Sequence, residues 1–370
     1  MDLQTGLTEL LEKASWAEKY SVEQSDILLQ ALRLAETLND APNTDKIRGQ
    51  YIECLNFQGR TEDAFPHFSL LLNRLDDPEA NIGLFDQINI LWKYKWFLSS
   101  LPNFPNIPKA QIFDIMADME RRYLGFQVGT QATVYYYKYV VYRELGEPET
   151  ANAYYEKFEE SKTNNANWLT LSDCDACIQD TEVGEALSGA HWERAVQVAQ
   201  PILSGEKKCE SVPHRTYFKV ALALAKMGQM DESAQYFEKG IHLLKEDRVN
   251  LDRNRRSICY LVYTGQWEGA LEVFEQNFHQ TLNLLEKSDV FHFYAAGLLL
   301  FRYLARTQPQ VHMSLPDNPL LYQPGGVYGT TEVVETLHQA VREIAAQFDQ
   351  RNENDYYSRE LLGFYDWFMP

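Results

Sequence analysis

Residues 132–161 read ATVYYYKYVVYRELGEPETANAYYEKFEES and carry the pattern that predicts the fold. Before Gly146, tyrosine and valine side chains recur at the spacing of a helix. After it, a small residue follows five positions on (Ala151), and an aromatic residue nine positions on (Tyr155). Glycine ends a helix well because a left-handed residue there satisfies the last free carbonyls. The stretch therefore predicts a helical hairpin, with Ala151 letting the helices approach and Tyr155 filling the seam with the next hairpin.

The same pattern recurs along the chain. Three more windows have it: Gly59/Ala64/Phe68, Gly228/Ser233/Phe237 and Gly265/Ala270/Phe274. A fifth window, Gly189-Ala190 followed by Ala195 and Ala199, keeps the turn but slips by one residue and lacks the aromatic. The glycines from 146 to 265 lie 43, 39 and 37 residues apart, and the 87 residues from 59 to 146 leave room for one degenerate repeat. We expect the helices of that repeat at about 82–100 and 109–124.

Over roughly residues 45–280 the pattern resembles the tetratricopeptide repeat, most closely in 132–161 and 214–243. The repeats exceed the ~34 residues typical of that family, its usual tryptophan is absent, and Ser233 replaces one small alanine. The resemblance implies an all-α, tetratricopeptide-like solenoid of helical hairpins that binds a protein or peptide partner.

The two ends of the chain fall outside the repeat register. Residues 2–39 read as two helices, and residues 307–330 contain four prolines and the Gly325-Gly326 pair, which predicts a long irregular loop. We expect an N-terminal helical cap at 1–42, the repeat array at 43–284, and C-terminal capping helices with the loop at 285–370.

The family register also predicts which side chains meet a partner. In such an array the first helix of each hairpin lines the concave face and the second lines the outside. The inward candidates are Tyr136, Arg143, Arg215, Phe218 and Arg255. Aromatic and arginine side chains are common binding anchors. The alternative is that each of them packs against a neighbouring helix or lies in water.

Four residues have the spacing of a structural zinc site. Cys174 and Cys177 form a Cys-x-x-Cys motif, and Cys209 is followed by His214. We expect the two cysteines to precede a helix at about 178–187 and Cys209 to follow its antiparallel partner at about 191–203. His214 would begin the next hairpin. All four ligands would then converge on one edge of the array.

Two alternatives to zinc stay open. The cysteines can be unrelated thiols, or the Cys-x-x-Cys pair can exchange disulfides, although the βαβ pattern usual for that chemistry is missing. The ligand pattern also resembles a group of uncharacterised bacterial repeat proteins with Cys-x-x-Cys and Cys-x4-His at this place. That resemblance implies a bacterial source and names no activity. Cys54 and Cys259 fall within helical periodicity and are predicted to be core residues.

The charge balance bears on the class of partner. The chain has 53 acidic and 34 basic residues and a formal net charge of -19. A field of that sign repels phosphate backbones and anionic lipid, so we expect no nucleic-acid or membrane partner, but a protein or peptide with a basic surface. The alternative is that the charge serves solubility alone. Residues 1–20 lack the layout of a signal peptide, and the longest apolar runs are too short for a bilayer, so we expect a cytoplasmic protein.

Motifs for catalysis are missing. The sequence has no Gly-x4-Gly-Lys-Ser/Thr, no His-Glu-x-x-His and no Gly-x-Ser-x-Gly, so we expect a protein that is not an enzyme. Zinc with four protein ligands would leave no position for a reactive water. Three functions compete: an interaction scaffold or adaptor, a bacterial antitoxin or immunity protein that neutralises a basic toxin, and a peptide-sensing regulator.

Overall fold

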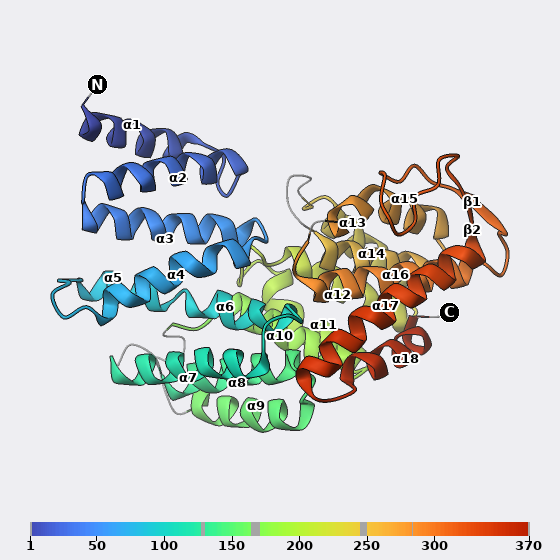
Figure 1. Cartoon of the computed structure of the whole chain (residues 1–370). Coiled ribbons are helices and arrows are strands. Elements are labelled where there is room, and N and C mark those ends of the chain that lie inside the picture. The colour runs from blue at the N-terminus through green and yellow to red at the C-terminus, as the bar shows by residue number, and fades with distance from the viewer. Residues whose placement is uncertain (1, 127–129, 164–170, 245–249, 283, 369–370) are drawn as a thin grey trace.

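The computed structural model describes residues 2–126, 130–163, 171–244, 250–282 and 284–368, and it consists almost entirely of antiparallel helical hairpins (Figure 1). The elements up to the middle of the chain are α1 (Leu3–Trp16), α2 (Val22–Thr37), α3 (Ala41–Phe57), α4 (Thr61–Asp76), α5 (Leu84–Leu91), α6 (Tyr94–Ser100), η1 (Leu101–Asn103), α7 (Lys109–Gly125), α8 (Gln131–Glu144) and α9 (Pro148–Thr163). The rest are α10 (Asp175–Ser188), α11 (Trp192–Leu203), α12 (His214–Lys226), α13 (Met230–Ile241), α14 (Leu251–Tyr263), α15 (Trp267–Asn277), η2 (Phe278–Thr281), α16 (Lys287–Leu304), β1 (Gln310–His312), β2 (Val327–Gly329), α17 (Thr330–Asn352) and α18 (Tyr356–Phe368). The all-α prediction is confirmed.

The hairpin turns follow the predicted chemistry. The four turn glycines are left-handed, with φ of 76° at Gly59, 72° at Gly146, 77° at Gly228 and 76° at Gly265. At the fifth turn Ala190 takes the left-handed conformation, with φ of 56°. Counted from Ala190, the buried Ala195 and Ala199 stand at the usual five and nine positions. The slip noted in the sequence is therefore a change of turn residue within an unchanged hairpin.

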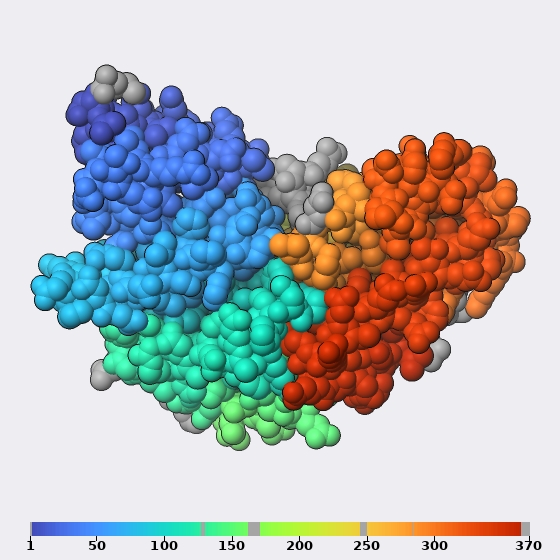
Figure 2. Space-filling model, in the orientation of Figure 1, coloured from blue at the N-terminus to red at the C-terminus, as the bar shows by residue number. Residues whose placement is uncertain are grey.

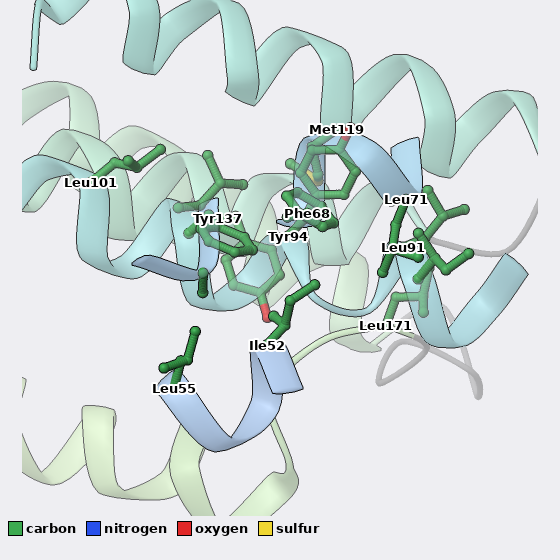
Figure 3. Close-up of a cluster of buried hydrophobic side chains, with 14 of the residues drawn as sticks. Ile52, Leu55, Phe68, Leu71, Leu91, Tyr94, Leu101, Met119, Tyr137 and Leu171 are labelled. Carbon is green, nitrogen blue, oxygen red and sulfur yellow. The ribbon is translucent and has the colours of Figure 1, made fainter. Parts of the chain in front are cut away.

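Small residues and aromatic rings make the seams as expected. The exposed fraction of Ala64, Ala151, Ser233 and Ala270 is 2% or less. Figure 3 shows part of the first apolar core, where Phe68 lies with its ring stacked on Phe97 at 4.5 Å between centroids. This core runs from Leu7 to Ile178, and a second one runs from Ala221 to Leu361. The expected caps at both ends share these cores with the repeats.

The C-terminal corner, residues 351–357, returns to the middle of the chain. Arg351 donates hydrogen bonds to the carbonyls of Pro102, at 2.6 Å, and Phe104, at 2.9 Å. Asn354 donates to the carbonyl of Leu145 at 2.9 Å, and Tyr356 packs directly on Gly146. Figure 2 shows the resulting contact between the C-terminal helices (red) and the segment near residue 100 (teal). The solenoid from about residue 100 onward thus closes into a ring, while α1–α4 extend from it as an arm (Figure 1).

Two predicted elements differ in detail. The helix expected at 82–100 is divided into α5 and α6, although Trp92 and Lys93 between them keep right-handed helical angles. The 307–330 loop is not irregular throughout, because β1 and β2 pair antiparallel across it, with Val311 opposite Tyr328. Both of these side chains are buried. Among the described residues, no helix combines the length and the apolar composition that crossing a membrane requires.

Candidate functional site

The ring of helices surrounds a central chamber that is partly open to solvent and has a cavity volume of about 470 Å³. Its walls are the first helices of successive hairpins, α8, α10, α12 and α14, completed by α16 and α18. The C-terminal corner closes this ring, because it places Tyr356 and Tyr357 on the wall beside the end of α8. The name chamber is used below for this cavity.

A buried carboxylate holds two cations on one side of the chamber. Asp180 is 1% exposed and accepts hydrogen bonds from the Thr216 hydroxyl, at 2.7 Å, and from Lys219 Nζ, at 2.9 Å. Arg215 Nε lies 2.8 Å from the same carboxylate. Burial opposes ionisation of Asp180, but Lys219 and Arg215 outweigh it and lower its pKa. Burial also lowers the pKa of Lys219 to about 8. A Cβ on Gly184 would lie 3.2 Å from Lys219 Nζ, so glycine gives this ammonium its room against α10.

The next repeat repeats this arrangement on α14. Asp252 lies 2.8 Å from Arg255 and 3.1 Å from Arg256, one turn further along the helix. Burial opposes ionisation here too, and the two arginines outweigh it, so the pKa of Asp252 falls well below its usual value. On α8 the numbers of cations and carboxylates are reversed. One cation, Arg143, lies between two carboxylates, Glu144 at 2.7 Å and Glu185 at 3.0 Å.

The side of the chamber formed by α16 and α18 carries carboxylates. Within the described part of the chain, Asp289 receives no hydrogen bond and forms no ion pair. Burial, followed by repulsion from Asp252, raises the pKa of Asp289 to about 6, against the opposing pull of Arg255 and His292. His292 Nε2 lies 3.3 Å from Glu360.

Four of the five predicted partner-binding residues line the chamber: Tyr136, Arg143, Arg215 and Arg255. Phe218 does not, and its prediction as an inward side chain is wrong. It is 2% exposed and packs edge-on against Phe237 on α13, over Gly240, because it points toward the second helix of its own hairpin.

The sequence motifs did not point to Asp180, Lys219, Asp252 or Asp289, which also line the chamber. The available signal was helical spacing, since Lys219 stands four positions after the predicted Arg215 and therefore shares its face.

The structure brings three cysteine thiols together. The sulfur atoms of Cys174, Cys177 and Cys209 lie within 4.8 Å of one another, and Cys177 and Cys209 are 3.5 Å apart. Hydrogen bonds from Cys174 and Cys177 lower the pKa of the Cys209 thiol. Cys174 caps α10, and Cys177 lies inside its first turn, because α10 starts three residues before the predicted 178. The group can hold a metal ion and rests on a small apolar cluster of Ala176, Ile202 and Val212.

His214 begins α12 as predicted but is not a member of this group of ligand atoms. A tight turn after Cys209 separates the three cysteines from His214 at the start of α12. In this turn the Cys209 amide donates a hydrogen bond to the Val212 carbonyl at 3.0 Å. The two other cysteines, Cys54 and Cys259, are buried in the cores as predicted.

Comparison with known proteins gives one family match. The model described as tetratricopeptide repeat matches residues 214–243, which are α12 and α13 of the structure. No curated protein matches the chain. The matched hairpin carries Arg215 and Lys219 into the chamber. The chain is thus similar to tetratricopeptide-repeat proteins, a class of helical-hairpin scaffolds for protein interaction, and its fold is a solenoid of that kind.

Proposed function

We propose that this protein is a binding protein, not an enzyme, and that it holds a protein or peptide partner in the chamber. The observation that carries the proposal is the convergence of charged side chains from four successive first helices and from α16 and α18 on one cavity. Charges removed from water are costly unless they are paired or have a ligand. Nothing in the packing of the hairpins requires so many of them, which favours a role in recognition.

The partner has a basic surface. The protein carries a formal net charge of -19. Seven carboxylates line the chamber, against five lysine and arginine side chains: Glu144, Asp173, Asp180, Glu185, Asp252, Asp289 and Glu360 against Arg143, Arg215, Lys219, Arg255 and Arg256. An adaptor and an antitoxin or immunity protein both fit this balance. The volume of about 470 Å³ favours a third candidate, a peptide-sensing regulator, because a short chain segment enters a cavity of that size more readily than a folded surface does.

The test is affinity capture from the native cells with matched charge variants. Arg256→Gln changes the chamber, whereas Arg359→Gln removes an exposed arginine elsewhere on α18. The partner should be captured by the wild type and by Arg359→Gln but lost from Arg256→Gln. Equal capture by all three proteins would place binding outside the chamber.

We further propose a structural zinc ion held by Cys174, Cys177 and Cys209, with His214 as fourth ligand. Two thiolates about 2.3 Å from one tetrahedral zinc lie about 3.8 Å apart, and the 3.5 Å between Cys177 and Cys209 is close to that spacing. The metal would fasten the α10–α11 hairpin, which has Ala199 at the repeat position that an aromatic residue takes in the other hairpins. Four protein ligands would give it a structural role.

Elemental analysis should find about one zinc per chain. Cys177→Ser and His214→Ala should release it, and Cys54→Ser and Cys259→Ser should keep it. Chelation should lower the melting temperature. Zinc retained in His214→Ala would leave a three-cysteine centre with another fourth ligand. Protein without metal that does not respond to added zinc would refute the site.

A further inference from the structure

The cations and carboxylates of the chamber are divided unequally among its helices. Four cations of α12 and α14 share two carboxylates, Asp180 on α10 and Asp252 on α14. These cations define the basic wall: Arg215, Lys219, Arg255 and Arg256. Asp173 also acts on Arg215, but it pairs with Lys95 at 3.8 Å. The basic wall therefore has four cations for two directly paired carboxylates, and Asp289 and Glu360 of the other helices act on Arg255 without an ion pair.

Elsewhere in the chamber carboxylates are in excess. The acidic wall consists of Glu144 on α8, Glu185 at the end of α10, Asp289 on α16 and Glu360 on α18. Arg143 is the one cation paired with the first two, Glu360 contacts the imidazole of His292, and Asp289 has no ion-pair or hydrogen-bond partner among the described residues. The chamber thus has a side rich in cations and a side rich in carboxylates, within a protein whose overall charge is strongly negative.

We propose that the chamber binds a zwitterionic ligand, an amino acid or a short peptide with free termini. Its carboxylate lies against the basic wall and its ammonium group against Asp289. The volume of about 470 Å³ falls in the range of small-molecule sites, about 300–1,000 Å³. The proposal rests on the chamber being the binding site of the proposed function, and it narrows the partner to a small ligand or a chain end.

On each wall, a ligand group of opposite charge would stabilise the ionised side chain. Burial lowers the pKa of Lys219 and raises that of Asp289, so each ionised form is disfavoured in the empty chamber. A carboxylate beside Lys219 and an ammonium beside Asp289 would reverse both effects. A ligand with only one of these groups would leave the other wall uncompensated.

The experiment is affinity selection with mass spectrometry on the full-length chain. The probes are a mixture of the common amino acids and a random tripeptide library, the latter supplied free, N-acetylated and C-amidated. Free ligands should be retained, and each blocked form should bind about tenfold more weakly or worse, because it lacks one charge-assisted contact. Retention of amino acids alone or of tripeptides alone would support the proposal and identify the source. No retention from either mixture, or retention insensitive to both blocks, would overturn it.

Two variants test which end of the ligand lies against which wall of the chamber. Asp289→Asn should bind N-acetylated and free ligands equally while still discriminating against C-amides. Arg256→Gln should show the reverse pattern, and Arg359→Gln should behave as the wild type. Melting temperatures of all variants confirm that they fold. A protein partner that is lost from Arg256→Gln while neither mixture is retained would refute the zwitterionic ligand and leave the proposed function intact.

Discussion

Substituting Gly146 by alanine tests whether the solenoid closes into a ring. Gly146 is left-handed, with φ of 72°, and a Cβ built on it would lie 2.4 Å from Cβ and Cγ of Tyr356. Gly228 is left-handed as well, with φ of 77°, but a Cβ there meets nothing within 4 Å. The pair therefore separates the backbone cost of alanine from the cost of pushing the C-terminal corner away.

The magnitudes follow from these two contacts. A left-handed alanine costs about 1–2 kcal/mol, which both variants incur. Gly146→Ala adds an overlap that Tyr356 must relieve by moving, and such overpacking costs about 1–3 kcal/mol more. We expect a loss of about 2–5 kcal/mol in the free energy of unfolding for Gly146→Ala and about 1–2 kcal/mol for Gly228→Ala.

Chemical denaturation measures the two losses, and hydrogen exchange locates them. Amides of residues 351–363 and 102–109 should lose protection in Gly146→Ala and keep it in Gly228→Ala. In a Tyr356→Ala background the extra cost at Gly146 should disappear, since the overlapping ring is gone. Equal destabilisation by both glycine substitutions in the wild-type background would refute the closure of the ring, and so would an extra cost at Gly146 that persists in the Tyr356→Ala background.

Three further outcomes follow from the structure. Asp289→Asn should stabilise the ligand-free protein at pH 7 by about 1–2 kcal/mol. The folded pKa of Asp289 is about 6, above the ordinary ~3.9, so the wild type loses stability as pH rises from about 4 to 6. Denaturation at about pH 4 and at pH 7 checks that the variant is the more stable protein only at the higher pH. Ala190→Gly should raise the free energy of unfolding by about 1 kcal/mol, since φ of 56° strains alanine, and an unchanged midpoint of denaturation would argue against that turn. The on-rate of a basic partner should fall as salt screens the net charge of -19, whereas a flat on-rate in stopped-flow mixing would assign that charge to solubility.

The repeat hairpins were predictable because their determinants are local. A turn glycine, a small residue and an aromatic ring stand at fixed offsets, and each acts within its own hairpin or at the next seam. The same locality explains why the three cysteines could be assigned to one edge. Two of them lie at the start of the first helix of a hairpin, Cys174 at its N-cap and Cys177 in its first turn, and the third follows its second helix.

Contacts between distant segments were not predictable in this way. Arg351 contacts carbonyls about 250 positions earlier in the chain, and no spacing rule connects them. The division between α5 and α6 is a similar case, since neither proline nor glycine marks Trp92 and Lys93. Packing of the completed fold determines both features.

The candidate site likewise has features that the sequence predicted and features that it did not. The first-helix register placed Arg215 and Arg255 on the chamber, but it also placed Phe218 there, which neighbours Arg215 in sequence and turns toward α13. The number of cations and carboxylates on each wall depends on ion pairs between different helices. Asp180 belongs to α10 and its cations Arg215 and Lys219 to α12, so their pairing is seen only in the folded chain.

The most direct test of the account is site-specific photo-crosslinking in the native cells. A benzophenone amino acid at Ser188, which is exposed and lines the chamber, reports on ligands inside the ring. The same group at Gln235, which is exposed on the second helix α13, reports on the outer face. The account predicts a specific adduct from Ser188 and none from Gln235, and the Ser188 adduct should disappear when Arg256→Gln is added. An adduct that forms at Gln235 while Ser188 stays unmodified would contradict binding in the chamber.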